Sequence, residues 1–218
     1  MTEAELAILR RAYAKQILFG VNIVDRRLEE ALAVSQKALE LDPLSPALHV
    51  QVGYRYSMIR QEDLAIKKFH DALELDPQLP LAHWYLSISY LLTGKMDEAI
   101  REIETAAQLM GHNQYYTALL GFTYARAGRI SEARRILEEL QQHAAREDVP
   151  ASDFAIISLA LDEIDKGFDL FEKAIDESED VLASVYGIRL LEPWHSHPRY
   201  HALRRKMNLA DLPEVPVP

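Results

Sequence analysis

The sequence contains no cysteine, which excludes a disulfide framework, a thiol nucleophile and a thiolate metal site. Positive charge is also scarce, because 24 Lys and Arg residues stand against 34 Asp and Glu and give a formal net charge of −10. Nucleic acid and anionic membranes are bound by clustered Lys and Arg, so this balance argues against both partners. Gly-rich phosphate loops and the GxSxG and HExxH motifs are missing as well. We therefore expect a protein that is not an enzyme and binds no cofactor.

Long apolar runs are absent from the sequence. The segment ILFGVNIV at 17–24 is far shorter than the roughly 20 apolar residues that span a bilayer. Hydrophobic residues make up 49% of the chain and charged residues 27%, which is a composition typical of globular proteins with a core. The sequence thus predicts a folded, cytoplasmic protein.

What the sequence does contain is an internal repeat. The six letters ALELDP occur at 38–43 and again at 72–77, 34 residues later. A fixed period of this length indicates a stack of helical or mixed supersecondary units. Two successive units of 34 residues, 46–79 and 80–113, carry small and aromatic residues at matching places. These are Val52, Gly53, Tyr56, Ala65, Phe69, Ala72 and Pro77 in the first unit, and Leu86, Ser87, Tyr90, Ala99, Ile103 and Ala106 in the second.

These positions resemble the signature of the tetratricopeptide repeat (TPR), a helix-turn-helix unit of 34 residues. A third unit follows at 114–147, and degenerate units are expected at about 12–45 and at 148–181. The resemblance implies an all-α fold, a right-handed superhelical solenoid of antiparallel helix pairs with about five repeats. Because no unit buries its apolar face alone, neighbouring units must stack, and the stack encloses a concave groove.

The end of the sequence has a different character. Residues 182–208 resemble the capping segment that often closes TPR arrays in bacterial signalling proteins and transcriptional regulators. We therefore expect a single solenoid domain over 1–208 that ends in a C-terminal capping helix. The proline-containing tail at 209–218 cannot continue a helix and is expected to be extended or disordered.

Small residues explain how the two helices of a unit can pack. Gly53 and Gly121 lie on first helices, and Ala65, Ala99 and Ala133 lie on second helices. Their small side chains allow two helix backbones to approach closely, while the bulky aromatic positions fill the space around them.

The TPR resemblance also implies which residues line the groove, since fixed positions of each first helix face it in that family. Carried over residue by residue, the predicted groove residues are Val50, Tyr54, Met58, Leu81, Trp84, Ile88, Leu91, Leu92, Tyr115, Phe122 and Arg126. Almost all are apolar, and an exposed apolar patch of this extent usually marks a contact surface.

The chemistry of the groove restricts the partner. TPR proteins that clamp a terminal carboxylate use Lys, Asn and Arg on these faces, and only Arg126 is available here. The sequence therefore predicts a scaffold or adaptor that binds an apolar or amphipathic protein segment and not an acidic C-terminal peptide. Trp84 and Tyr54 are the expected anchors, because buried aromatic residues carry much of the binding energy at interfaces.

Three alternatives remain open at this point. The groove can be covered by the N-terminal helix of the same chain, by its tail, or by a second copy in a homo-oligomer. The chain can also be the regulatory TPR portion of a larger bacterial transcriptional regulator or signalling enzyme. The least favoured alternative is a metal site formed by His195, His197 and His201, whose imidazoles could gather around zinc or nickel.

Overall fold

The computed structural model describes residues 28–111, 113–144, 149–176 and 189–206, and all regular structure in these ranges is helical. The helices are α2 (Leu28–Leu41), α3 (Pro46–Met58), α4 (Glu62–Leu75), α5 (Pro80–Leu92), α6 (Met96–Leu109), α7 (Gln114–Arg126), α8 (Ile130–Ala144), α9 (Ala151–Ala160), α10 (Ile164–Asp176), the short 3-10 helix η2 (Glu192–Trp194) and α12 (Pro198–Lys206).

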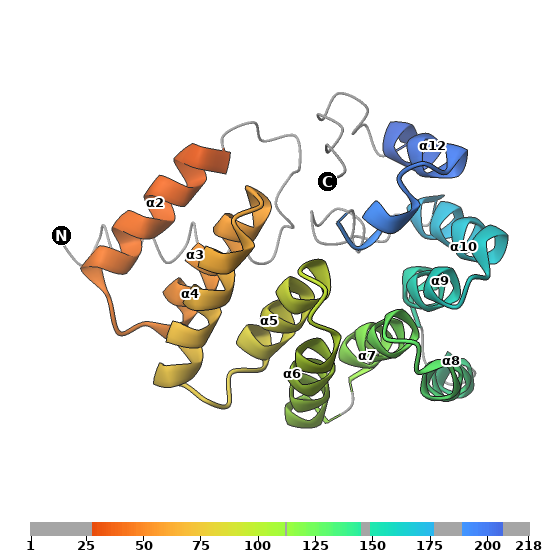
Figure 1. Ribbon diagram of the computed structural model, residues 1–218, viewed down its shortest axis with the longest axis horizontal. Helices are drawn as coiled ribbons and strands as arrows, with labels where there is room; N and C mark the ends of the chain where they lie inside the picture. Colours follow the sequence, from red (N-terminus) through yellow and green to blue (C-terminus); the bar gives the residue numbers. More distant parts are fainter. Residues whose placement is uncertain (1–27, 112, 145–148, 177–188, 207–218) are drawn as a thin grey trace.

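The helices pack in sequential pairs around an arch (Figure 1). Within the described ranges four pairs are complete, α3 with α4, α5 with α6, α7 with α8 and α9 with α10, and α2 packs against α3. In Figure 1, α5, α7 and α9 lie on the inner side of the arch and α6, α8 and α10 on the outer side. The predicted all-α solenoid of helix pairs is confirmed for the described part of the chain.

The inner helices keep the period found in the sequence. α3, α5 and α7 are each 13 residues long, and their first residues, Pro46, Pro80 and Gln114, are 34 positions apart. Proline suits the first position of a helix, because its missing N–H needs no partner there. The fourth inner helix, α9, is shorter and begins at Ala151 after Pro150. The first helix of the unit at 12–45 and the proline-containing tail at 209–218 lie outside the described residues, and so do parts of the predicted domain and its limits.

Every complete pair turns at a residue with left-handed backbone. These residues are Arg60 (φ 63°), Gly94 (φ 76°), Gly128 (φ 78°) and Asp162 (φ 64°), each 34 positions from the next. Glycine adopts this conformation without steric cost, whereas other L-residues do so rarely. Arg60 and Asp162 are therefore the exceptions among four equivalent turns.

Glycine is required where two helices touch. A Cβ added at Gly53 would lie 2.6 Å from the Phe69 ring, and one at Gly121 would lie 2.7 Å from Ile136 Cγ2. Such distances are too short for any real side chain, so these glycines permit the close approach of α3 to α4 and of α7 to α8. The packing role predicted for both glycines is confirmed.

Tyrosine hydroxyls join successive pairs at equivalent places. In each case a tyrosine on an inner helix contacts a residue 20 positions earlier, on the outer helix of the preceding pair. The three hydrogen bonds are Gln36 Nε2 to Tyr56 Oη (2.7 Å), His70 Nε2 with Tyr90 Oη (2.9 Å) and Tyr124 Oη to Glu104 Oε1 (2.6 Å). The apolar rings thus fill the core, while their hydroxyls connect one unit to the next.

Two histidines, to which sequence reasoning assigned no role, make a second repeated contact. His49 Nε2 lies 3.0 Å from the Pro43 carbonyl oxygen, and His83 Nε2 lies 3.1 Å from that of Pro77. The other ring nitrogen of His83, Nδ1, lies 2.6 Å from Glu102 Oε2. Because both nitrogens of His83 face acceptors, only the protonated ring donates at both. Each histidine therefore links an inner helix to the turn that precedes it.

The C-terminal helix closes the array. Tyr200 and Leu203 of α12 are buried in a cluster with Phe168 and Phe171 of α10. Arg199 Nη2 reinforces this contact by donating to Asp169 and Glu172 of α10, at 2.6 and 2.8 Å. The predicted capping helix is confirmed.

Replacement of His83 by glutamine should remove part of the pH dependence of stability. Burial lowers the pKa of His83, but its hydrogen bonds to Glu102 and to the Pro77 carbonyl outweigh this and hold the pKa above the ordinary value of 6.5. A raised pKa stabilises the fold fully below pH 6.5, and this contribution is lost as pH rises through the pKa of the folded state. Urea unfolding of wild type and His83→Gln should therefore differ more at pH 5.5 than at pH 8.5. An equal difference at both pH values would contradict this.

The inter-unit tyrosine contact should be measurable by a double-mutant cycle. Burial first, and then the hydrogen bond to Glu104, raise the pKa of Tyr124 to about 12, so its hydroxyl remains a donor at neutral pH. Tyr124→Phe removes this hydrogen bond and should lower the free energy of unfolding by about 1 kcal/mol. When Tyr124→Phe is combined with Glu104→Ala, the changes in the free energy of unfolding measured in urea should be non-additive by a similar amount. Strict additivity would show that the contact contributes nothing.

Candidate protein-binding face

The eleven predicted groove residues lie on the inner helices α3, α5 and α7, but most of them are not exposed. At most 9% of the surface is accessible for Val50, Tyr54, Met58, Trp84, Ile88, Leu91 and Phe122. Leu81 and Leu92 are half-buried, Arg126 is exposed, and the Tyr115 side chain lies outside the described set. The expectation of an open apolar groove is therefore wrong for the seven buried residues.

One reason is that successive inner helices pack on each other through aromatic rings. The Tyr85 ring lies 5.4 Å from the Tyr54 ring and 4.7 Å from the Trp84 ring, and it stacks on Phe69 at 5.6 Å. Burial raises the pKa of Tyr54 to about 12. The predicted anchor Tyr54 thus contributes to the packing between units, and the predicted anchor Trp84 is buried in the same cluster.

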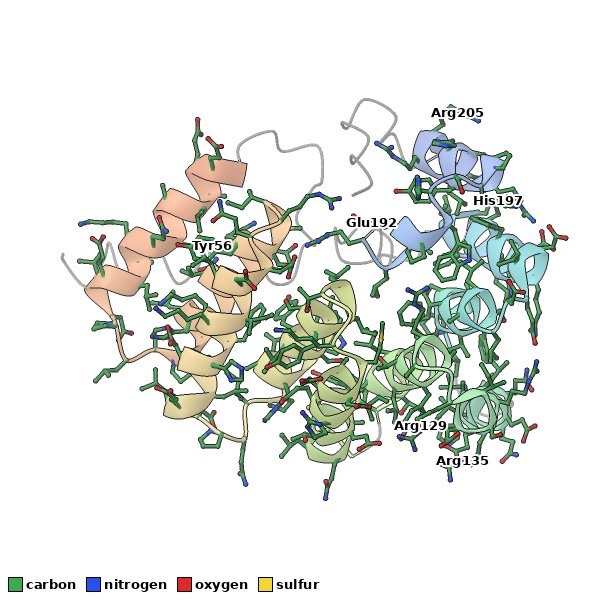
Figure 2. The ribbon with its side chains drawn as sticks, in the orientation of Figure 1. Tyr56, Arg129, Arg135, Glu192, His197 and Arg205 are labelled. Atoms are coloured by element: carbon green, nitrogen blue, oxygen red, sulfur yellow. The ribbon has the colours of Figure 1, made fainter. Side chains whose placement is uncertain are left out.

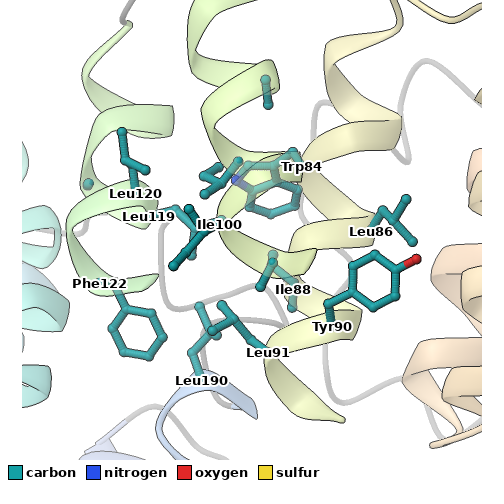
Figure 3. Close-up of a cluster of buried hydrophobic side chains, with 14 of the residues drawn as sticks. Trp84, Leu86, Ile88, Tyr90, Leu91, Ile100, Leu119, Leu120, Phe122 and Leu190 are labelled. Atoms are coloured by element: carbon teal, nitrogen blue, oxygen red, sulfur yellow. The ribbon is translucent and has the colours of Figure 1, made fainter. Parts of the chain in front are cut away.

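The second reason is a segment from the end of the chain, Arg189–Trp194, which we call the strap. It lies on the inner side of the arch in Figure 1. Leu190 of the strap is buried in the same cluster as Leu91 and Phe122 (Figure 3). The Trp194 ring lies 6.5 Å from the Phe122 ring, at an edge-to-face angle of 61°. The chain itself thus occupies part of its concave face.

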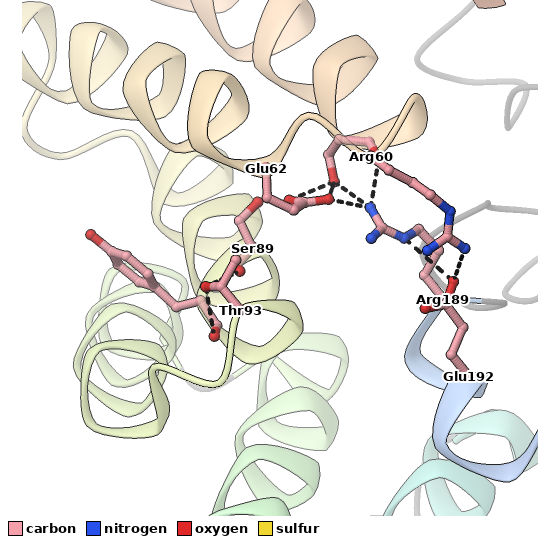
Figure 4. Close-up of polar contacts among 8 residues, drawn as sticks. Arg60, Glu62, Ser89, Thr93, Arg189 and Glu192 are labelled. Carbon is pink, nitrogen blue, oxygen red and sulfur yellow. Dashed lines mark hydrogen bonds and ion pairs between the residues drawn. The ribbon is translucent and has the colours of Figure 1, made fainter. Parts of the chain in front are cut away.

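Arg189 fixes the strap to the opposite end of the arch. Its Nη1 donates to the Ser57 carbonyl oxygen at 2.5 Å and to the Ser57 hydroxyl at 3.0 Å, and it pairs with Glu62 Oε1 (Figure 4). The Ser57 hydroxyl in turn donates to the Glu62 carboxylate, 2.8 and 3.0 Å from its two oxygens. The ion pair is nearly closed to water, with 7% of the Arg189 side chain and 11% of Glu62 exposed.

A second ion pair lies beside the first. Arg60 Nη2, at the turn between α3 and α4, is 2.5 Å from Glu192 Oε1 of the strap. Glu192 also lies 3.6 Å from Arg189 Nε, which is too long for a hydrogen bond. Figure 2 shows Glu192 on the inner side of the arch, whereas Arg129 and Arg135 lie on its outer side. The strap therefore joins residues 132 positions apart in the sequence.

Comparison with known proteins bears on the fold. No family model matches the sequence, and no curated protein matches it. Several solved structures do match. TTC0263, a TPR protein of Thermus thermophilus, matches with a TM-score of 0.58 and 21% identity over 76% of this chain and 91% of its own. PilF of Pseudomonas aeruginosa matches with a TM-score of 0.56 and 17% identity over 91% of both chains.

A third similar structure comes from a larger assembly, the Cut9–Hcn1 hetero-tetramer of the APC/C. The TM-score is 0.59 at 18% identity over 86% of this chain. This chain spans only 34% of that one. The three structures agree with the repeat signature and with the helix pairs described above. The chain has the TPR fold.

Within the TPR array, the two ion pairs of the strap differ in what they contribute. A buried pair loses so much hydration that its net stabilisation is small, although removal of one partner leaves a buried charge and costs about 3–5 kcal/mol. The Arg60–Glu192 pair is more exposed and stabilises by about 1 kcal/mol at most. The two ion pairs therefore specify where the strap lies and contribute only modestly to its net stabilisation.

The three histidines at the end of the TPR array occupy different surroundings. His195 Nδ1 lies 2.9 Å from the Glu192 carbonyl oxygen, His197 stacks on Phe168 at 4.7 Å, and His201 lies against Tyr200. In the described ranges, no group of three or more His, Cys, Asp or Glu residues is placed to hold a metal ion. Among the described helices, none has the length and apolar character needed to cross a membrane.

Sequence reasoning missed the polar residues that hold the strap, namely Arg189, Glu62, Arg60 and Glu192. One signal was available. Arg60 occupies the turn position that holds Gly94 and Gly128 in the next two units, and a bulky residue there is unusual. Nothing in the repeat pattern indicates that Arg189 contacts the turn between α3 and α4.

Replacement of Glu62 by glutamine should release the strap. The glutamine amide cannot neutralise Arg189. Burying the unpaired guanidinium would then cost more free energy than docking of the strap contributes. The chain has two tryptophans, so Trp84→Phe leaves Trp194 as the only one. In that background, Glu62→Gln should shift Trp194 emission to longer wavelength and increase its quenching by acrylamide.

Glu138, exposed on α8, offers the matched control. Glu138→Gln in the same single-tryptophan background should leave the emission unchanged. Equal spectra for Glu62→Gln and its parent would mean that the ion pair does not hold the strap.

Proposed function

We propose that this TPR protein is a non-enzymatic scaffold that binds a partner protein through the inner face of its arch. The observation that carries the proposal is the strap, a short peptide segment seated on that face by one aliphatic, one aromatic and one cationic side chain. A surface that accommodates one peptide segment has the shape and chemistry to accommodate another. The TPR fold itself is consistent with a protein-interaction scaffold.

The contacts of Arg126 favour an apolar or amphipathic partner over an acidic tail. This arginine is the one cation among the predicted groove residues, and its guanidinium carbon lies 5.8 Å from the centre of the Trp194 ring. Cation–π contact of this kind binds an aromatic side chain. A partner that brings an aromatic residue to Arg126 retains this contact, whereas a terminal carboxylate would need a set of donors that the predicted groove lacks.

Site-specific photocrosslinking in cells of the source organism tests the proposal. A benzophenone amino acid is placed at Leu92, half-buried at the end of α5, and in a matched control at Glu138, exposed on the outer helix α8. The experiment is done in wild type and in Glu62→Gln, with helix content checked by circular dichroism. We expect an adduct with a different protein from position 92 and not from position 138.

Two results would overturn the scaffold function. Equal adducts from both positions, or none in either background, would mean that the inner face does not bind partners. Adducts of position 92 with other copies of this chain alone would assign the face to self-assembly.

A further inference from the structure

The strap specifies the kind of segment that the inner face binds, an inference that rests on the proposed function. We propose that the strap is an internal substitute for the partner, and that the partner displaces it with a segment of the same chemistry. Arg189, Leu190, Glu192 and Trp194 define that segment. It carries an arginine, an aliphatic residue at +1, an acidic residue at +3 and an aromatic residue at +5.

Each of these side chains has its own site on the TPR array. The guanidinium of Arg189 lies against Ser57 and Glu62. The aliphatic side chain of Leu190 lies in the hydrophobic cluster that contains Leu91 and Phe122. The indole of Trp194 contacts both Phe122 and Arg126. Leu191 belongs to the other cluster, with Tyr200 and Phe168, so it serves the cap and is not part of the pattern.

Any segment that covers the guanidinium site as the strap does must bring a cation to it. Glu62 is largely buried, and its carboxylate is held in place by the Ser57 hydroxyl at the end of α3. A buried carboxylate without a positive partner is strongly unfavourable. A partner that leaves this site empty would therefore compete poorly with the strap. An arginine suits the site better than a lysine, because its fork of donors can reach a carbonyl, a hydroxyl and a carboxylate together.

The backbone at Arg60 also points to a ligand site. Arg60, like Asp162, adopts left-handed φ where Gly94 and Gly128 serve the other two equivalent turns, and the Arg60 side chain pairs with Glu192 of the strap. Backbone strain of this kind concentrates at ligand clamps, where a side chain must be presented from a fixed turn. At Arg60, an acidic residue of the strap receives that side chain. The same contact is open to an acidic residue at +3 of a partner segment.

A labelled synthetic peptide tests the proposal directly. The probe is acetyl-RLLEPWHS, the sequence of residues 189–196, carrying a fluorophore at its C-terminus. Binding to the full chain is followed by fluorescence anisotropy. Wild type should bind about tenfold more weakly than Arg189→Ala/Trp194→Ala, because its own strap occupies the site for most of the time. The control peptide ALLEPWHS should bind the double variant at least about tenfold more weakly than the probe, since Glu62 then lacks a cation.

Two outcomes would overturn the proposal. One is equal binding of the probe and the control peptide. The other is absence of binding to a double variant that retains its helix content and thermal transition.

If the double variant does not fold, a protein whose strap is covalently bridged to the turn between α3 and α4 provides a second test. The chain has no cysteine, so Arg60→Cys/Glu192→Cys introduces two unique thiols at the strap contact. A short bismaleimide then ties the strap in place, and the unbridged variant is the control. Both forms lack the Arg60 contact, so the comparison isolates the effect of the strap. The bridged protein should bind the probe at least about tenfold more weakly than the unbridged protein, and should lose any position-92 adduct that the unbridged protein gives. Retention of probe binding after bridging would overturn the proposal.

Failure of this inference is distinguishable from failure of the scaffold function. A position-92 adduct with a partner, together with no probe binding, would leave the scaffold in place and reject the strap as its substitute. Probe binding without any partner adduct would support the peptide site and reject the cellular role.

Discussion

The whole structure depends on one constraint, that no helix pair can bury its apolar face alone. Each pair must pack on the next, and small residues let the helices meet, as Gly121 does against Ile157 of the following pair. Stacking buries the apolar faces between neighbouring helix pairs, but it leaves the inner face and the two ends of the array to be covered in another way. The tyrosine hydroxyls and His83 fix successive pairs, and α12 covers the C-terminal end. The strap covers part of the inner face that the stack creates.

Coverage by the strap combines two kinds of interaction with different consequences. Leu190 and Trp194 remove apolar surface from water, which favours docking without specifying position. The Arg189–Glu62 pair specifies position, because a guanidinium and a carboxylate tolerate burial only when they meet. Its net stabilisation is small for the same reason. A segment held in this way is well defined in the folded protein and can still be exchanged for one that offers the same groups.

The repeat made most of the fold predictable from the sequence. The period of 34 residues and the small residues at Gly53 and Gly121 follow from the packing of helices in a repeated unit. The candidate site was predicted only in part. The inner positions of α3, α5 and α7 were identified, but their burial was not. A pattern that describes one unit contains no information about aromatic packing between units, or about the strap that packs on them from a distant part of the chain.

The proposed function is inferred from residues that the repeat pattern does not explain. A repeat unit needs glycine or another small residue at its turn, so Arg60 at that place is a departure that packing within the unit does not require. Its explanation is the ion pair with Glu192, a residue of the strap. In the same way, Glu62 begins an outer helix, where an acidic residue suits the helix dipole, yet it is buried against Arg189. In a repeat protein, function is therefore best sought where one unit differs from its neighbours and the difference is satisfied by a distant part of the chain.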